Sequence, residues 1–239
     1  MTGPGAIPQR DTVTQQPAHP TPTRFKARVI KLGEFFFRNR SWTPIPWLVF
    51  MALCTFKHAP DLITWVPGLM FLALGEWLRL WAVAVVGKGS RTRGGGVERL
   101  VTYGPYAHVR NPLYLGNFLL TMGTVFISEL LWMVPIVIVL FTIQYLSIIL
   151  WEEQILTERF GSDYATYCQR VPRWIPRWRR SPQEPTAIPY QWRAAWWSER
   201  STLGAIAALL IVMLVKENLK HLPKYLHKHF AVPASHHLP

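Results

Sequence analysis

The sequence predicts an all-α integral membrane protein with four to five transmembrane helices. Half of the 239 residues are hydrophobic, twelve are tryptophan, and the mean hydropathy is positive at +0.12. Long apolar segments alternate with short basic ones, which is the pattern of membrane-crossing helices joined by juxtamembrane loops. The 26 lysines and arginines outnumber the 13 acidic residues, but nearly all of them flank apolar segments and no nucleic-acid-binding motif accompanies them. The basic charge therefore indicates a membrane surface rather than RNA or DNA as the partner.

Two segments precede the first apolar one. Residues 1–23 are rich in proline, threonine and glutamine and have no apolar core, so they are predicted to be a disordered tail and not a secretory signal. Residues 24–41 place six basic residues among apolar residues at roughly helical spacing, which predicts an amphipathic helix on the membrane surface. A basic flank with incidental aromatic residues accounts for the same pattern equally well.

Four apolar segments within the predicted core, residues 42–180, are expected to cross the membrane. They are residues 42–56, 62–86, 112–127 and 130–151. The first is near the minimum length for a hydrocarbon core about 30 Å thick. The joint between the last two is so short that they must form an antiparallel hairpin. Glu76 and Arg79 interrupt the second segment on one helix face, and we expect a structural ion pair in the protein interior, with a ligand contact as the alternative.

Basic residues also predict the orientation. They concentrate in residues 88–110 and 159–200, which places both stretches in the cytoplasm. Residues 181–239 are predicted to be a proline-rich linker, a short apolar segment and a basic tail. The apolar segment, residues 203–215, is too short for a clear span and its crossing would carry four lysines over, so we expect it to be re-entrant or interfacial.

Charged residues meet at one end of the predicted hairpin. The stretch GPYAHVRNPLYLG, residues 104–116, carries Arg110 at the entrance to the third span, and Glu152 and Glu153 follow the fourth. The hairpin puts these three residues near one another on the same side of the membrane. Each alone could be a snorkelling or first solvated side chain. Together they predict a binding or catalytic site, because charges at membrane depth are costly unless they bind something.

The spaced motifs RNPxY, EE and FGSDYATYCQRVPRWIP around a hydrophobic hairpin resemble the isoprenylcysteine carboxyl methyltransferase family, whose relatives include phospholipid N-methyltransferases and membrane sterol reductases. The resemblance covers about residues 75–178. It implies a small helical membrane enzyme that binds S-adenosyl-L-methionine in a cytoplasmic pocket at the end of the hairpin. It implies catalytic roles for Arg110, Tyr114 and Glu153. The residues that it implies for the cofactor pocket are His108, Asn111, Glu152, Tyr164, Tyr167, Val171, Pro172 and Arg173.

One position departs from the family pattern. Asn111 stands where the commonest eukaryotic form has histidine. An amide can donate and accept hydrogen bonds but cannot take up a proton. A role as a base is therefore not expected at this position.

The resemblance implies methyl transfer to a lipophilic acceptor that enters sideways from the bilayer, with the carboxylate of a prenylated cysteine as the leading expectation. That acceptor is already ionised at neutral pH and needs a cation such as Arg110, whereas an amine acceptor needs Glu152 or Glu153 to take its proton. The alternatives are N-methylation of a phospholipid head group and a non-catalytic, lipid-binding membrane scaffold. Membrane lipid is the expected environment, in the inner membrane of a bacterium or the endoplasmic reticulum of a eukaryote, and no metal ligand set is predicted.

Overall fold

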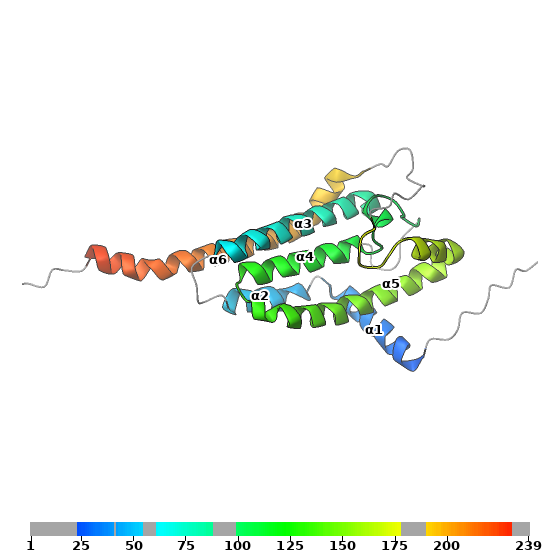
Figure 1. The fold of residues 1–239 in the computed structure, drawn as a ribbon, viewed down its shortest axis with the longest axis horizontal. Helices are drawn as coiled ribbons and strands as arrows, with labels where there is room; N and C mark the ends of the chain where they lie inside the picture. Colours follow the sequence, from blue (N-terminus) through cyan, green and yellow to red (C-terminus); the bar gives the residue numbers. More distant parts are fainter. Residues whose placement is uncertain (1–22, 41, 55–60, 88–98, 178–189, 231–239) are drawn as a thin grey trace, which may run out of the picture.

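The computed structural model describes residues 23–40, 42–54, 61–87, 99–177 and 190–230, and within these ranges the regular elements are all helices (Figure 1). In chain order they are α1 (Arg24–Arg38), α2 (Pro44–Cys54), α3 (Leu62–Val86), η2 (Gly104–Ala107), α4 (Pro112–Ile127), η3 (Leu131–Met133), α5 (Val134–Arg170) and α6 (Trp192–Phe230). The predicted all-α class is confirmed. The predicted disordered tail, apart from Thr23, residues 181–189 of the predicted linker and residues 231–239 of the predicted basic tail lie outside the described residues.

Within the described ranges, three helices are long and apolar enough to cross a membrane. They are α3, the continuous stretch Leu131–Arg170, and Trp192–Val215 within α6, while α4 is a shorter apolar helix. Helix α2 has 11 residues. At 1.5 Å per residue it reaches only about half of the way across a hydrocarbon core of about 30 Å. The described part of the predicted first span is therefore too short to cross, and residues 55–56 lie outside the described ranges.

Helix α6 corrects the expectation for residues 203–215. These residues are not a separate short segment, because they continue a helix that begins at Trp192, and Trp192–Val215 is long and apolar enough to cross a membrane. The apolar pattern begins late because Glu199 and Arg200 interrupt it. In Figure 1, α6 lies beside α3 and extends beyond the rest of the bundle.

Four glycines let α3 and α4 approach each other backbone to backbone. A Cβ atom built on Gly75 would lie 2.8 Å from the carbonyl oxygen of Gly116, and one built on Gly123 would lie 2.9 Å from that of Gly68. On each helix the two glycines are seven positions apart, so they lie on the same face, two turns from each other. Such small-residue contacts are the usual means of close helix packing in membranes. The seam fixes the position of α4, at whose start Arg110 lies.

The predicted hairpin is confirmed. Helix α4 ends at Ile127, and a turn that includes Glu129 at a φ of 58° leads through η3 into α5. Apolar side chains from α2, α4 and α5 fill the closed end of the hairpin. The buried members of this cluster are Met51, Met122, Val125, Met133 and Val137.

Helix α1 docks against α5, which it crosses obliquely in Figure 1. Its contact point is Gly33, where an added Cβ would lie 2.0 Å from the carbonyl oxygen of Ser147. One turn later, the ring of Phe37 lies 4.7 Å from that of Trp151. The helix predicted for residues 24–41 is thus present as Arg24–Arg38, and it brings the end of α1 close to Glu152.

Candidate active site

The carboxylate of Glu153 joins two arginines at the open end of the hairpin. Arg110 Nη1 donates to Glu153 Oε1 over 3.1 Å. Arg173 donates to the same carboxylate twice, from Nε over 3.0 Å and from Nη2 over 2.6 Å. Burial alone would lower the pKa of Arg110, but the adjacent Glu153 carboxylate raises it overall, so the guanidinium remains charged. This Arg110–Glu153–Arg173 cluster therefore carries a net positive charge.

Backbone contacts bring the two halves of this cluster together. Residues 108–111, which lead into α4, lie along residues 172–177, which follow α5. The bonds are Arg110 N–H to the Pro172 carbonyl (2.9 Å), Asn111 Nδ2 to the Arg173 carbonyl (3.3 Å), His108 Nδ1 to the Arg177 carbonyl (2.8 Å) and Arg177 N–H to the His108 carbonyl (3.0 Å). A carbonyl can only accept, so His108 carries its proton on Nδ1. The structure thus brings together His108, Asn111, Pro172 and Arg173, four of the residues predicted for the cofactor pocket.

A bend in α5 turns its last turns toward this segment. Gly161 interrupts the helix at φ 48° and ψ −118°, a conformation that favours glycine. Beyond it, Tyr164, Tyr167 and Val171 are buried together. The Tyr167 hydroxyl donates to the carbonyl of Tyr106 over 2.8 Å. Burial raises the pKa of the Tyr106 hydroxyl above its ordinary value, so this neighbouring phenol stays neutral.

Cys168 connects the buried tyrosines to the charged cluster. Its sulfur accepts a hydrogen bond of 2.9 Å from Arg110 Nη1, the same nitrogen that contacts Glu153. It also packs against the apolar cluster that contains Tyr164 and Tyr167. Three predicted lining residues and the predicted catalytic arginine therefore belong to one contiguous site.

Tyr114 and Glu152 form the neighbouring half of the site. Their side chains are hydrogen-bonded to each other. Arg40 lies close enough to both for its charge to act on them, and its guanidinium is 4.1 Å from the centre of the Phe37 ring. Sequence reasoning missed Arg40, because an arginine in an amphipathic segment looks like any other surface charge. Only the docking of α1 on α5 places it here.

A second polar cluster lies inside the bundle, around Arg79 of α3. Arg79 Nη2 lies 2.5 Å from Glu199 Oε2 of α6, and Arg79 Nε lies 3.8 Å from Glu76 Oε2. Arg79 also donates to Asn117 of α4, whose amide in turn donates to the Tyr145 hydroxyl of α5 over 3.1 Å. The expectation that Glu76 and Arg79 face the interior is confirmed. The partner missed from the sequence is Glu199, whose side chain is only 1% exposed.

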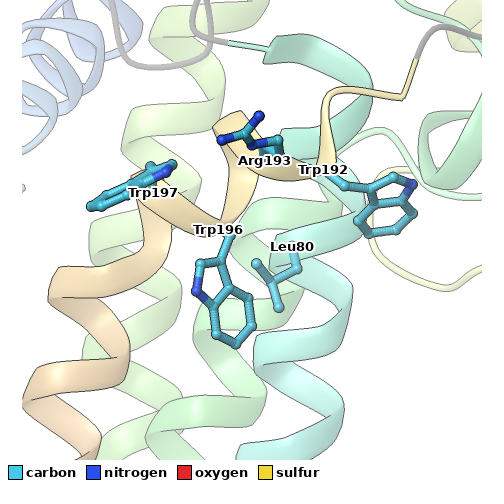
Figure 2. A pocket seen from close by; sticks show the side chains of 5 residues that line it. All are labelled: Leu80, Trp192, Arg193, Trp196 and Trp197. Atoms are coloured by element: carbon cyan, nitrogen blue, oxygen red, sulfur yellow. The ribbon is translucent and has the colours of Figure 1, made fainter.

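An open hollow of about 500 Å³ lies elsewhere, where α6 begins beside α3 (Figure 2). It is lined by Leu80, Trp192, Arg193, Trp196 and Trp197. Figure 2 shows the indole of Trp196 and the side chain of Leu80 close together, with Trp197 directed to another side of α6. Tryptophan with arginine is typical of the membrane interface. None of the residues predicted for the cofactor pocket lines this hollow.

Comparison with known proteins identifies the family. A profile described as phospholipid methyltransferase matches residues 63–163, from α3 to the bend in α5. The cobalt-zinc-cadmium resistance protein CzcN of Cupriavidus metallidurans is 30% identical over 155 residues, which cover 61% of this chain and 68% of that protein. The chain therefore belongs to the family of membrane methyltransferases that includes the phospholipid methyltransferases. The nickel-cobalt-cadmium resistance protein NccN of Alcaligenes xylosoxydans xylosoxydans is 28% identical over 154 residues, with the same two shares.

The family includes isoprenylcysteine methyltransferases, as the motifs indicated. The protein-S-isoprenylcysteine O-methyltransferase of Schizosaccharomyces pombe is 35% identical over 127 residues, which cover 46% of this chain and 48% of that protein. The chain thus spans about half of the length of this relative. No solved structure matches the chain. The matched region contains Arg110, Tyr114 and the acidic pair, whereas Arg40 and Glu199 lie outside it.

Proposed function

We propose that this family member transfers a methyl group from S-adenosyl-L-methionine to a lipophilic acceptor at the open end of the α4–α5 hairpin. The observation that carries the proposal is the Arg110–Glu153–Arg173 cluster, which lies beside the start of α4 and at the end of the apolar part of α5. A carboxylate held by two half-buried arginines is costly to build at a membrane boundary, which supports a binding role. Because basic residues gather at this end, we place the site on the cytoplasmic face.

The charged cluster fits an amino-acid ligand. Among the described residues, Arg110 Nε is a buried donor without a hydrogen-bond partner. A ligand carboxylate would satisfy this donor and balance the net positive charge around Glu153. S-adenosyl-L-methionine, when bound, supplies an electrophilic methyl group on a sulfonium and carries such a carboxylate. Arg110 and Arg173 would hold the carboxylate of this cofactor. Tyr164, Tyr167 and Val171 would exclude water from the part of the cofactor next to that carboxylate.

The leading acceptor is the carboxylate of a prenylated cysteine. Glu153 already accepts three hydrogen bonds from arginines, so it orients cations and does not act as a base. A carboxylate acceptor is ionised at neutral pH and needs only a cation to hold it. Arg40, beside Tyr114 and Glu152, is a second cation for that purpose. The name of the Schizosaccharomyces pombe relative supports a prenylated acceptor.

N-methylation of a phospholipid head group is the second candidate, and the Tyr114–Glu152 pair favours it. Glu152 is the acidic residue of the site that does not pair with Arg110 or Arg173 in the described structure, so it is the group able to take a proton from an ammonium acceptor. The name of the matching family profile supports this acceptor. Labelled methyl groups distinguish the two, because carboxyl esters are base-labile and methylamines are not.

Titration with S-adenosyl-L-homocysteine tests the cofactor. Glu153→Gln leaves one carbonyl oxygen to serve two arginines and turns an amide N–H₂ toward one of them. The two guanidinium groups then lose the orientation in which they would hold the ligand carboxylate. We expect the ligand to lose about one charge-assisted hydrogen bond, about 1.5–3 kcal/mol, so that it binds about 10- to 100-fold more weakly. Glu158→Gln is the matched control, because Glu158 lies on the same helix, is exposed and bonds Gln154.

Calorimetry on the purified protein in detergent measures both variants. Saturable binding that Glu153→Gln weakens and Glu158→Gln does not supports the proposal. A folded wild-type protein that binds no S-adenosyl-L-homocysteine refutes it and leaves the non-catalytic scaffold.

A further inference from the structure

The Arg79 cluster connects α6 to the hairpin through the middle of the bundle. Glu199 holds Arg79 over 2.5 Å, and Thr202, one turn along α6, is 3.1 Å from Glu199 and 3.4 Å from Arg79. Arg79 donates to the Asn117 carbonyl oxygen, which fixes the orientation of that amide. The Asn117 N–H₂ then faces the Tyr145 hydroxyl at 3.1 Å. One chain of polar contacts therefore runs from α6 through α3 and α4 to α5.

This chain of contacts ends against the active site. The ring of Tyr145 lies 5.1 Å from the ring of Tyr114, and Tyr114 is hydrogen-bonded to Glu152. Tyr145 is itself held from the other side, because its ring stacks on Phe141 at 4.0 Å. A tyrosine fixed at both its hydroxyl and its face gives Tyr114 a rigid neighbour. Movement of Asn117 would release the hydroxyl end.

Polar contacts are not needed to attach α6 to the bundle. Leu209 and Met213 of α6 already pack against Leu72 and Ile127 in an apolar cluster. A buried carboxylate within a span is expensive, and such residues usually serve a function. Glu199 also lies outside the region matched by the family profile. The free-energy cost of burying the Glu199 carboxylate therefore requires a reason other than the packing of α6.

We propose that Glu199 is a positioning residue for the acceptor half of the site. It fixes Arg79, and through Asn117 and Tyr145 it sets the position of Tyr114 beside Glu152. The inference rests on the proposed methyl transfer, in which Tyr114 and Glu152 face the acceptor. The donor half, around Glu153, depends on different contacts and stays unchanged when Glu199 is replaced.

A double-mutant cycle with Glu199→Gln and Tyr145→Phe tests the coupling. Each single change is expected to lower kcat/KM for the acceptor about tenfold, mainly through KM, with the affinity for S-adenosyl-L-homocysteine unchanged. The double variant is expected to be no worse than the poorer single variant, because both changes break the same chain. Arg200→Gln is the matched control, since it removes an exposed charge from the next position, where Arg200 lies over the Trp197 ring.

Fluorine NMR of protein labelled with 3-fluorotyrosine provides a readout that needs no turnover. The Tyr145 signal, assigned by its loss in Tyr145→Phe, is expected to shift in Glu199→Gln and to stay in place in Arg200→Gln. Additive kinetic losses, or a Tyr145 signal that does not shift in Glu199→Gln, would overturn the positioning role. Glu199 would then serve only to attach α6 to α3. If the wild-type protein methylates none of the acceptors, the proposed function fails, while the NMR result still decides whether Glu199 orders Tyr145.

Discussion

Gly33→Ala is the smallest change that should detach α1 from the hairpin. The new methyl group would lie 2.0 Å from the Ser147 carbonyl oxygen and 2.5 Å from its carbonyl carbon, where ordinary contact begins near 3.4 Å. Both atoms belong to the backbone of α5 and cannot turn aside. Overpacking of this kind costs about 1–3 kcal/mol, and the better helix propensity of alanine returns up to about 1 kcal/mol. We expect a net loss of about 1–2 kcal/mol in the docking of α1.

Hydrogen exchange of the protein in lipid nanodiscs measures this loss directly. Because 1.4 kcal/mol is a factor of ten, amides of residues 24–38 should exchange about 5- to 30-fold faster, while those of α3 keep their rates. Gly204→Ala is the matched control, because nothing lies within 4 Å of a Cβ atom at that position. Unchanged exchange in Gly33→Ala would show that α1 does not dock through Gly33. The argument that places Arg40 beside Glu152 would then fail with it.

Two further predictions concern the glycine seam and Arg40. Gly75→Ala should lower the melting temperature in detergent by several degrees, because its Cβ atom would lie 2.8 Å from a backbone oxygen of α4 and overpacking costs about 1–3 kcal/mol. The control Gly204→Ala should leave the melting temperature equal or higher. Equal melting temperatures of Gly75→Ala and the wild type would contradict the close contact between α3 and α4. Arg40→Gln should lower turnover of a carboxylate acceptor about tenfold with no change in S-adenosyl-L-homocysteine affinity; undiminished turnover of that acceptor would remove Arg40 from the site.

The hairpin end could be predicted from the sequence because its geometry is local. Two apolar segments joined by a short turn leave little freedom, so Arg110 and the acidic pair had to meet. In the structure, Arg110 does lie 3.1 Å from one member of the pair, Glu153. The assignment of partners within the pair did not follow. Successive helix residues point in different directions, and only the structure shows Glu153 on the arginines and Glu152 on Tyr114.

Contacts between distant helices could not be predicted in the same way. The pattern of residues 24–40 indicates an apolar face but does not name its partner, so the docking of α1 at Gly33 was not foreseen. Hydropathy likewise hid the start of α6, because Glu199 interrupts the apolar pattern although its side chain reaches into the bundle. In a single sequence, a glutamate that pairs with an arginine of another helix cannot be distinguished from a glutamate in a loop. The partner of Glu199, Arg79, was visible as an interior residue, but the sequence offered only Glu76 or a ligand as its partner.

The two halves of the site differ in where their supports come from. The donor half is built from the ends of α4 and α5 and closed by backbone hydrogen bonds between residues 108–111 and 172–177. The acceptor half, Tyr114 and Glu152, is flanked by Arg40 from one side and by the chain from Glu199 on the other, and both of these lie outside the matched family region. Under the proposed function, we therefore expect substitutions in the flanking helices to change the use of the acceptor without changing the affinity for the donor. For this reason the identity of the acceptor should be sought with the full chain, since residues 63–163 lack Arg40 and Glu199 and also Arg173 of the donor half.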